Sequence, residues 1–384
     1  MDSAWKGPAI SPAIVKTKGE NFTRLTGEWM TPRRRFLSAL YGGRVDKVPA
    51  MTLSSVITLD SMEIADAWFP EAHLDAEQMA RLAATAHEVL GLDTIMPVFH
   101  SQLEADALDA ATWWGTVDNW PATNDHVLTD PEDFRIPSDY LKRPSFEAVL
   151  GAIRLLRKRY PDVGIVGKVY GPWSVGYHLV GIENYLMDTI LDPDKIRRYL
   201  EVMLPACMMS AHAQLEAGAD AIMWADHANR ELVSPETYRD FLLEMHKEVT
   251  VEMGGPSIFH CCGETTDRID YFAEAGWDCF HFESQVDPYV AKEIAGDRMS
   301  LMGNINNPTT LFSGTYEDTY EACMKVMQAG INGIAPEGSV PLGTKNDVLM
   351  ALADSARDYS DTHRPDERLV VHDPPPAENG AEAD

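Results

Sequence analysis

A histidine and a cysteine two residues apart, His260 and Cys262 in the segment 257–263, are the strongest chemical signal in the sequence. Side chains alternate along a strand, so these two point the same way and Cys261 points to the other side. Zn²⁺ accepts an imidazole and a thiolate that converge on one point. A core histidine beside an inert buried thiol has the same pattern, and the residues alone leave both interpretations open.

A catalytic zinc usually has three protein ligands and one open position, so the pair needs a third donor. Glu337 follows the short apolar run 333–335 and is the first candidate. Glu283 follows the run 279–282 and is the second. Either is also consistent with an ordinary loop carboxylate.

Further polar residues stand where apolar runs end. Asp226, next to His227, could orient a metal-bound imidazole, act as an acid or base, or cap the next segment. Glu104 is the second candidate for positioning or protonating a substrate. The residues expected to line the substrate pocket are Tyr170, His178 and Asn304. The chain has no phosphate-loop spacing, no GxGxxG after a strand and no Ser-His-Asp constellation.

The elements that must position these residues alternate between strand and helix. Apolar runs predict eight strands, at Val48–Leu53, Thr94–Val98, Ile165–Tyr170, Ala221–Ala225, Ser257–Cys262, Cys279–Phe282, Ser300–Gly303 and Gly333–Ala335. Amphipathic helices are expected between them, for example at 75–90, 146–158, 193–217 and 235–253. This order predicts an α/β fold, a single (β/α)8 TIM barrel, with a doubly wound sheet as the alternative. Barrel chemistry sits at the C-terminal ends of strands, where the candidate residues fall.

The chain is expected to form one domain with two extensions. Thr31 and Pro32 are an N-cap and a first-turn proline that open a helix through Tyr41. Residues 1–30 are expected to be an N-terminal arm, 31–365 the catalytic barrel, and 366–384 a flexible acidic tail rich in Pro and Ala.

Composition bears on partners and location. The chain carries 60 acidic and 32 basic residues, a formal charge of −28, which disfavours nucleic acid and anionic membranes. Five cysteines, two of them adjacent, do not resemble a secreted disulfide framework. With no apolar leader and no long apolar segment, a cytoplasmic location is expected. A homodimer is an assembly that the sequence leaves open.

Taken together, these segments resemble the uroporphyrinogen decarboxylase superfamily, in its zinc-dependent, corrinoid-linked methyltransferase branch. The resemblance covers about Thr31 to Arg357. It is carried by residues 30–37 with 46–49, 171–174 with 178–181, 216–220, 259–263, 303–305 and 335–341. It implies a (β/α)8 barrel and zinc at His260 and Cys262. The family's later cysteine, in a Pro-x-Cys setting, is replaced here by Gly338, so the resemblance does not supply the third ligand.

The resemblance implies methyl transfer between a small methylated substrate and a corrinoid (cobalamin) carried by a partner protein. A site with one thiolate should leave zinc a harder Lewis acid, which favours an oxygen-bearing donor such as a methyl ether. An O-demethylase is therefore the favoured subtype. The alternatives are a metal-free decarboxylase, although residues 51–55 lack that subfamily's arginine-rich motif, and a barrel that only binds a small molecule.

Overall fold

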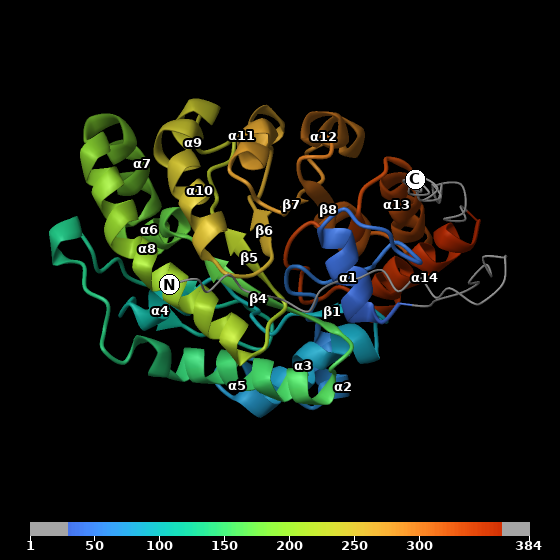
Figure 1. The fold of residues 1–384 in the computed structure, drawn as a ribbon. Coiled ribbons are helices and arrows are strands. Elements are labelled where there is room, and N and C mark those ends of the chain that lie inside the picture. The colour runs from blue at the N-terminus through green and yellow to red at the C-terminus, as the bar shows by residue number, and fades with distance from the viewer. Residues whose placement is uncertain (1–29, 363–384) are drawn as a thin grey trace, which may run out of the picture.

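The computed structural model describes residues 30–362, and its centre is a curled parallel sheet (Figure 1). Seven strands are hydrogen-bonded in the order β1-β4-β5-β6-β7-β8-β9. They are β1 (Thr94–Ile95), β4 (Gly164–Tyr170), β5 (Ala221–Ala225), β6 (Ser257–His260), β7 (Cys279–Phe282), β8 (Ser300–Ile305) and β9 (Gly333–Pro336). Two antiparallel strands of two residues each, β2 (Thr112–Trp113) and β3 (Ala122–Thr123), pair with one another and do not belong to this sheet.

An extended segment around Ala50 joins the two edges of the sheet. Ala50 forms a parallel bridge with Ile334 of β9, and the Met51 N–H donates to the Ile334 carbonyl at 2.9 Å. On its other side, the Ala50 carbonyl accepts from the N–H of Asp93, next to β1, at 2.7 Å. This segment is the expected first strand, shortened to a bridge. The predicted (β/α)8 barrel is therefore confirmed, with its first strand reduced to this bridge.

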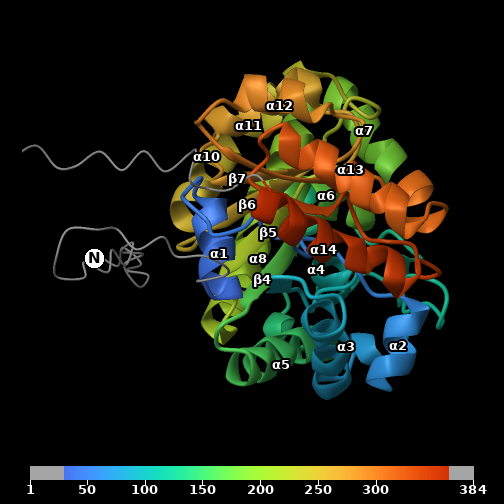
Figure 2. The same cartoon turned by 90° about the vertical axis from the view of Figure 1, so that its right-hand side faces the viewer.

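Helices lie outside the strands in both views (Figure 1 and Figure 2). They are α1 (Pro32–Leu40), α2 (Leu59–Ala65), α3 (Ala76–Glu88), α4 (Leu103–Ala107), α5 (Pro144–Arg159), α6 (Pro172–Val180), α7 (Ile182–Leu191), α8 (Pro193–Ala217), α9 (Pro235–Phe241), α10 (Leu243–Glu252), α11 (Ile269–Glu274), α12 (Pro288–Ala295), α13 (Tyr316–Gln328) and α14 (Asn346–Thr362). Short turns of other helix types are η1 (Glu71–His73), η2 (Pro131–Asp133), η3 (Tyr140–Lys142), η4 (Thr266–Arg268) and η5 (Asn307–Phe312).

Local sequence explains where several helices begin. Thr31 caps α1 by accepting from the Arg34 N–H, with Pro32 in the first turn, as predicted. Asp75 caps α3 in the same manner. The single helix expected over 235–253 is wrong in one respect, because it divides at Leu242, whose φ of −111° departs from the usual helical value of about −63°.

The barrel interior changes character along its axis. Apolar side chains from successive strands fill its lower part, among them Met51, Met96, Val166, Met223, Ile258 and Met302. Because side chains alternate along each strand, the next inward positions of β4 and β6 are Lys168 and His260. The polar groups therefore stand on an apolar floor at the C-terminal end of the strands, where barrels carry their chemistry.

The proposed N-terminal arm and C-terminal tail lie almost entirely outside the described residues. Within 30–362, no helix combines the length and apolar composition that crossing a bilayer requires.

Candidate metal centre

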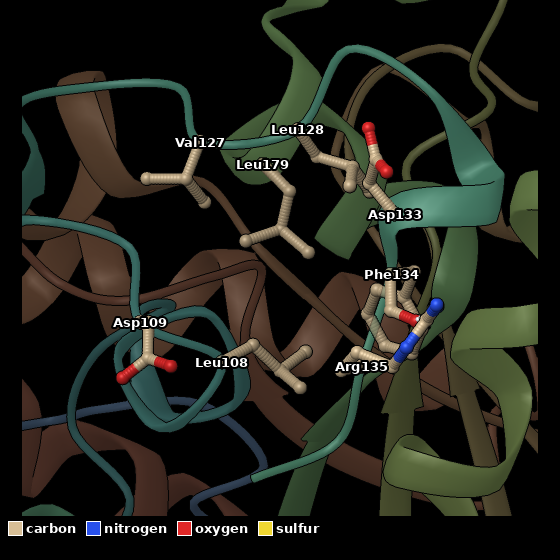
Figure 3. Close-up of a pocket in the computed structure, with 8 residues that line it drawn as sticks. All are labelled: Leu108, Asp109, Val127, Leu128, Asp133, Phe134, Arg135 and Leu179. Atoms are coloured by element: carbon tan, nitrogen blue, oxygen red, sulfur yellow. Dashed lines mark hydrogen bonds between the residues drawn. The ribbon is translucent and has the colours of Figure 1, made fainter.

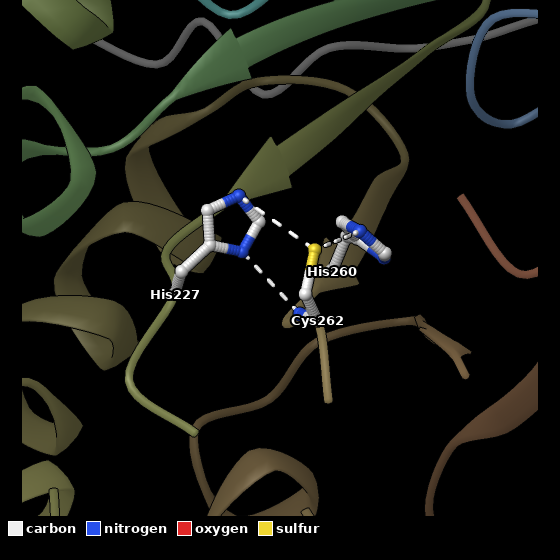
Figure 4. Close-up of side chains that lie close together, drawn as sticks. All are labelled: His227, His260 and Cys262. Atoms are coloured by element: carbon white, nitrogen blue, oxygen red, sulfur yellow. Dashed lines mark hydrogen bonds between the residues drawn. The ribbon is translucent and has the colours of Figure 1, made fainter. Parts of the chain in front are cut away.

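Three side chains converge at the mouth of the barrel, as Figure 4 shows: His227, His260 and Cys262. One ligand atom from each lies within 4.8 Å of the others. Cys262 Sγ is 3.3 Å from His260 Nε2 and 4.0 Å from His227 Nε2. The predicted shared direction of His260 and Cys262 is confirmed, and Cys261 is buried on the other side of the strand, where its surroundings include Tyr238 and Arg268.

The His260 ring is held in the tautomer that a metal requires. Its Nδ1 lies 3.1 Å from the carbonyl oxygen of His281 and donates to it, so Nε2 keeps a free lone pair facing Cys262. The His281 ring stacks on it at 4.7 Å, and burial, followed by the proximity of His281, lowers the His260 pKa well below its usual range. A neutral imidazole with a free Nε2 is a ready metal ligand.

His227 has the opposite tautomer. Its Nδ1 lies 3.3 Å from the backbone N–H of Cys262 and accepts from it, so the ring proton sits on Nε2, which faces the thiol. Burial, and then the charge of Lys168, lowers the His227 pKa to about 4 and keeps the ring neutral. In this orientation His227 is a hydrogen-bond donor toward the site. The only sequence signal for His227 is its position next to Asp226. The sequence predicts an orienting or acid–base role for Asp226 and none for His227.

The surroundings of Cys262 oppose ionisation of its thiol, and a bound cation would favour it. Burial raises its pKa, and the neighbouring Glu283 carboxylate, which interacts with the thiol, raises it further. A divalent metal reverses this effect because it binds the thiolate directly. Tetrahedral zinc, with bonds of about 2.3 Å to sulfur and 2.0 Å to nitrogen, separates the two ligand atoms by about 3.5 Å. The 3.3 Å between Cys262 Sγ and His260 Nε2 fits that requirement.

The two carboxylates proposed as third ligand have different surroundings. Both oxygens of Glu337 accept backbone N–H groups, from Asn307 at 2.7 Å and Ser284 at 2.9 Å, so this side chain ties two loops together. Glu283 uses one oxygen to accept from the N–H of Gly263, at 2.8 Å, in the left-handed turn (φ +81°) after Cys262. The other Glu283 oxygen lies 3.5 Å from where a Cβ at Gly338 would be. Glu283 therefore lies between Cys262 and Gly338.

Asp226 does not belong to the cluster formed by His227, His260 and Cys262. Its carboxylate accepts from Trp224 Nε1 at 2.9 Å, from the Ser174 N–H at 2.9 Å and from His246 Nε2 at 3.1 Å. The Ser174 hydroxyl in turn accepts from the His227 N–H. A direct contact of Asp226 with a bound metal ligand is not part of this arrangement, and its connection to the site runs through Ser174 and His227.

Glu104 is fully buried beside β4. Ser210 donates to one carboxylate oxygen at 2.7 Å and the Tyr170 N–H lies 3.3 Å from the other. Burial raises the Glu104 pKa to about 7, against these hydrogen bonds and the charge of Lys168. A carboxyl group with such a pKa can exchange a proton near neutral pH.

The three residues expected to line the pocket differ in their contacts, and only Tyr170 packs against a residue of the cluster. Tyr170 packs edge-on against His227 with ring centroids 5.8 Å apart. His178 hydrogen-bonds Thr123 Oγ1 at 2.9 Å, and its proximity contributes to the lowered pKa of His227. Asn304 donates to the carbonyls of Glu283 and Val286 and so fastens the loop after β7.

Lys168 was not anticipated from the sequence. It lies on β4 with 3% of its surface exposed, its ammonium 4.9 Å above the Tyr170 ring. Burial lowers its pKa to about 8. Within an apolar strand run a single lysine reads as an interruption, and only the alternation of β4 assigns it to the interior.

A surface hollow elsewhere on the molecule contains none of the expected site residues (Figure 3). It is lined by Leu108, Asp109, Val127, Leu128, Asp133, Phe134, Arg135 and Leu179. The candidate chemistry is therefore at the barrel mouth.

Comparison with known proteins identifies a family, related sequences and a solved structure of similar fold. Residues 31–359 match the family model described as Uroporphyrinogen decarboxylase (URO-D). The chain is 33% identical over 331 residues to a methylated-thiol–coenzyme M methyltransferase of Methanosarcina mazei, covering 86% of this chain and 90% of that one. It is 29% identical over 333 residues to the methylcobamide:CoM methyltransferase MtaA of Methanosarcina barkeri, covering 86% and 98%. A solved methyltransferase from Methanosarcina mazei superposes with a TM-score of 0.83 at 30% identity, covering 86% and 99%.

Proposed function

Because the chain belongs to the uroporphyrinogen decarboxylase family, we propose that it is a zinc-dependent methyltransferase that moves a methyl group between a small methylated substrate and a corrinoid on a partner protein. The observation that carries this proposal is the pairing of His260 Nε2 with Cys262 Sγ at 3.3 Å, with His260 Nδ1 bonded to a carbonyl. Two relatives, a methylated-thiol–coenzyme M methyltransferase and a methylcobamide:CoM methyltransferase, support the same reaction class.

His260 and Cys262 would hold the zinc. When bound, zinc supplies Lewis-acid chemistry that polarises a methylated heteroatom or stabilises a thiolate. The corrinoid carries the methyl group, and the protein supplies placement and charge.

The chain's other residues orient the substrate and move protons. The Nε2–H of His227 points at the reacting region and can donate to the heteroatom that gains or loses the methyl group. Glu104, whose pKa burial raises to about 7, would take up or return a proton beside Tyr170. Asp226 positions His227 through Ser174.

Glu283 is better supported than Glu337 as the third zinc ligand. It interacts with Cys262, and one of its oxygens lies beside the Gly338 position, where the family resemblance implies a cysteine. Glu337, the first choice from sequence, already accepts two backbone N–H groups. A carboxylate in place of a thiolate makes the zinc harder, which supports an oxygen-bearing donor such as a methyl ether. The relatives' names instead favour a thiol, so both classes belong in the test.

The test of this function is methyl transfer by the zinc-loaded protein. We expect transfer from at least one methyl donor to cob(I)alamin, followed by its visible spectrum, with a panel of methyl ethers, methyl thioethers and methanol. The reverse direction is run with methylcob(III)alamin and thiols. Removing zinc with a chelator should abolish the rate, and adding zinc should restore it. No transfer in either direction by zinc-loaded protein would overturn the proposal, and decarboxylation by the metal-free protein would establish the alternative.

The third-ligand assignment predicts different results for two matched variants. Glu283→Gln should weaken zinc binding about 10- to 100-fold, because the amide cannot supply the negative charge of the carboxylate. Glu337→Gln should leave zinc affinity within a few-fold of wild type. Competition with a chromophoric chelator measures both.

A rescue variant separates ligand loss from damage to the loop. A Cβ at Gly338 would meet no atom closer than 3.5 Å, so a cysteine fits there without displacing backbone. Glu283→Gln combined with Gly338→Cys should recover the lost affinity, since a thiolate then replaces the carboxylate. If Glu337→Gln is the variant that loses zinc, the third ligand is Glu337.

A further inference from the structure

His246 of α10 is a buried polar residue that the proposed mechanism does not use. Its side chain is 0% exposed and packs against the ring of Phe259 on β6, with centroids 5.1 Å apart. Both ring nitrogens are nonetheless hydrogen-bonded, Nε2 to the Asp226 carboxylate at 3.1 Å and Nδ1 to the Tyr238 hydroxyl at 2.8 Å. A carboxylate can only accept, so the ring proton is on Nε2 and the tyrosine donates to Nδ1. Tyr238 therefore selects the tautomer of His246 that donates to Asp226.

The break between α9 and α10 makes the contact between Tyr238 and His246 possible. The two residues are 8 positions apart, which in one continuous helix would separate them by about 12 Å along the axis. The two side chains cannot hydrogen-bond across that distance. Because the helix divides at Leu242, the rings lie with centroids 5.5 Å apart and the hydroxyl reaches the imidazole. The break, which no local sequence signal marks, is therefore linked to the orientation of His246.

Asp226 depends on three N–H donors to stabilise its charge. It is 0% exposed, and within residues 30–362 no lysine or arginine forms an ion pair with it. Trp224 Nε1 and the Ser174 N–H donate to the carboxylate, each at 2.9 Å, and His246 supplies the third donor. A buried carboxylate that loses a charge-assisted hydrogen bond must take up a proton or turn toward another donor. Either change disturbs the bond to Ser174, which leads on to His227.

Ser174 links the position of Asp226 to the backbone of His227. The Ser174 hydroxyl accepts from the His227 N–H at 2.9 Å, and the Tyr177 hydroxyl donates to the His227 carbonyl at 3.0 Å. Both hydroxyls belong to α6, directly after β4. Burial lowers the pKa of His227 and the Asp226 carboxylate opposes this effect, so the two side chains are also coupled through charge. With the backbone fixed on both sides, the ring lies where its Nδ1 accepts from the Cys262 N–H and its Nε2–H faces the thiol.

We propose that His246 and Tyr238 are positioning residues that keep the Nε2–H of His227 directed into the site. The inference rests on the proposed function only in taking His227 to donate to the reacting heteroatom. The neighbours of His246 include the aromatic rings of Phe259 and Trp277, among which a phenylalanine would fill the same space without burying two polar nitrogens. Packing alone therefore does not require the imidazole, whereas holding the Asp226 carboxylate does.

Ring ¹⁵N chemical shifts measure the tautomer of His227 without metal, corrinoid or turnover. The full chain is labelled with ¹⁵N-histidine, and the His227 signals are identified by their loss in His227→Asn. Protonated and bare ring nitrogens have separate shifts, so in wild type we expect a protonated Nε2 and a bare Nδ1. In His246→Phe both shifts should move toward their mean, because the ring then samples both tautomers. Tyr238→Phe should cause a smaller movement in the same direction.

Two further variants separate loss of the donor from loss of packing. His246→Gln keeps an N–H close to the position of the imidazole Nε2 and should keep the wild-type tautomer of His227. His212→Phe removes an exposed histidine of α8 whose Nε2 bonds the Glu252 carbonyl, and it should change nothing at His227. Thermal unfolding shows that each variant is folded, and Tyr238→Phe, which retains the imidazole, carries the test if His246→Phe is not.

Steady-state methyl transfer by the zinc-loaded protein gives the second readout. His246→Phe should lower kcat about 10-fold and leave KM and zinc affinity within about 2-fold of wild type, since the hydrogen-bond donor is misplaced while the metal ligands stay. His246→Gln should restore kcat to within about 3-fold of wild type. A folded His246→Phe protein with the wild-type kcat would contradict the inference.

The outcomes separate this inference from the proposed function. A His227 tautomer that is unchanged in His246→Phe or, if that variant is not folded, in Tyr238→Phe overturns the positioning role. The same holds if wild type already samples both tautomers, or if His246→Gln changes His227 as much as His246→Phe does. If methyl transfer proceeds normally in these cases, the proposed function stands. A His227 tautomer that depends on His246, in a protein with no methyl transfer, overturns the function and supports the positioning role.

Discussion

Replacing His260 or Cys262 by alanine is expected to remove zinc and methyl transfer together. Each variant leaves too few donors to hold the metal, because the proposed third ligand is a carboxylate and the imidazole and thiolate would carry most of the affinity. Metal content measured by mass spectrometry should fall from about one zinc per chain to less than about a tenth. The methyl-transfer rate should fall more than about 100-fold.

The adjacent cysteine is the matched control for this result. Cys261 is buried and points to the other side of the strand, away from His260 and Cys262. Cys261→Ala removes a thiol one residue from the site and should keep full zinc occupancy and activity, with at most a modest loss of stability. Zinc that persists in both His260→Ala and Cys262→Ala would show that the metal lies elsewhere.

Replacing Arg35 by methionine is expected to destabilise the barrel by about 3–5 kcal/mol. The side chain is 1% exposed, and its guanidinium bonds both oxygens of Asp46, at 2.7 and 3.0 Å, and a carboxylate oxygen of Asp93. It also donates to the Met30 carbonyl at 2.9 Å. Removing it leaves two carboxylates facing one another in the interior, next to the Asp93 N–H that bonds the closing segment at Ala50.

Urea unfolding followed by circular dichroism measures this loss, provided that the transition is two-state. Arg298→Met is the control, because Arg298 pairs with Asp270 on the surface, with both side chains at least half exposed. A surface pair contributes about 0–1 kcal/mol, so this variant should unfold close to wild type. An equal and small effect of both substitutions would show that the Arg35 pairs add little to stability.

Much of the fold follows from residue order. The strands at 221–225 and 279–282 have the predicted bounds, and the helix at 193–217 has its predicted ends. Short apolar runs flanked by glycine or polar residues and long amphipathic stretches are local signals, and their alternation specifies a parallel barrel. The break at Leu242 between α9 and α10 has no such signal, because no proline or glycine marks it.

The site was only partly predictable. Alternation along one strand was enough to place His260 and Cys262 side by side and Cys261 opposite, since that relation is local. The direction of Asp226, the tautomer of His227 and the choice between Glu283 and Glu337 depend on hydrogen bonds to groups on other elements, such as Trp224, His246 and Ser284. No local pattern carries that information.

Lys168 shows most clearly the difference between what the sequence determines and what the tertiary structure determines. Its inward direction follows from the period of β4, but its meaning comes from the absence of an acceptor around its ammonium among the described residues. A buried charge is paired only if neighbouring strands and loops bring an acceptor within about 3 Å of it. These segments are far apart in the sequence, so the sequence does not show which acceptor is near. The order of residues specified the barrel and its candidate metal-binding pair, whereas the packing of distant segments decided which neighbours complete the site.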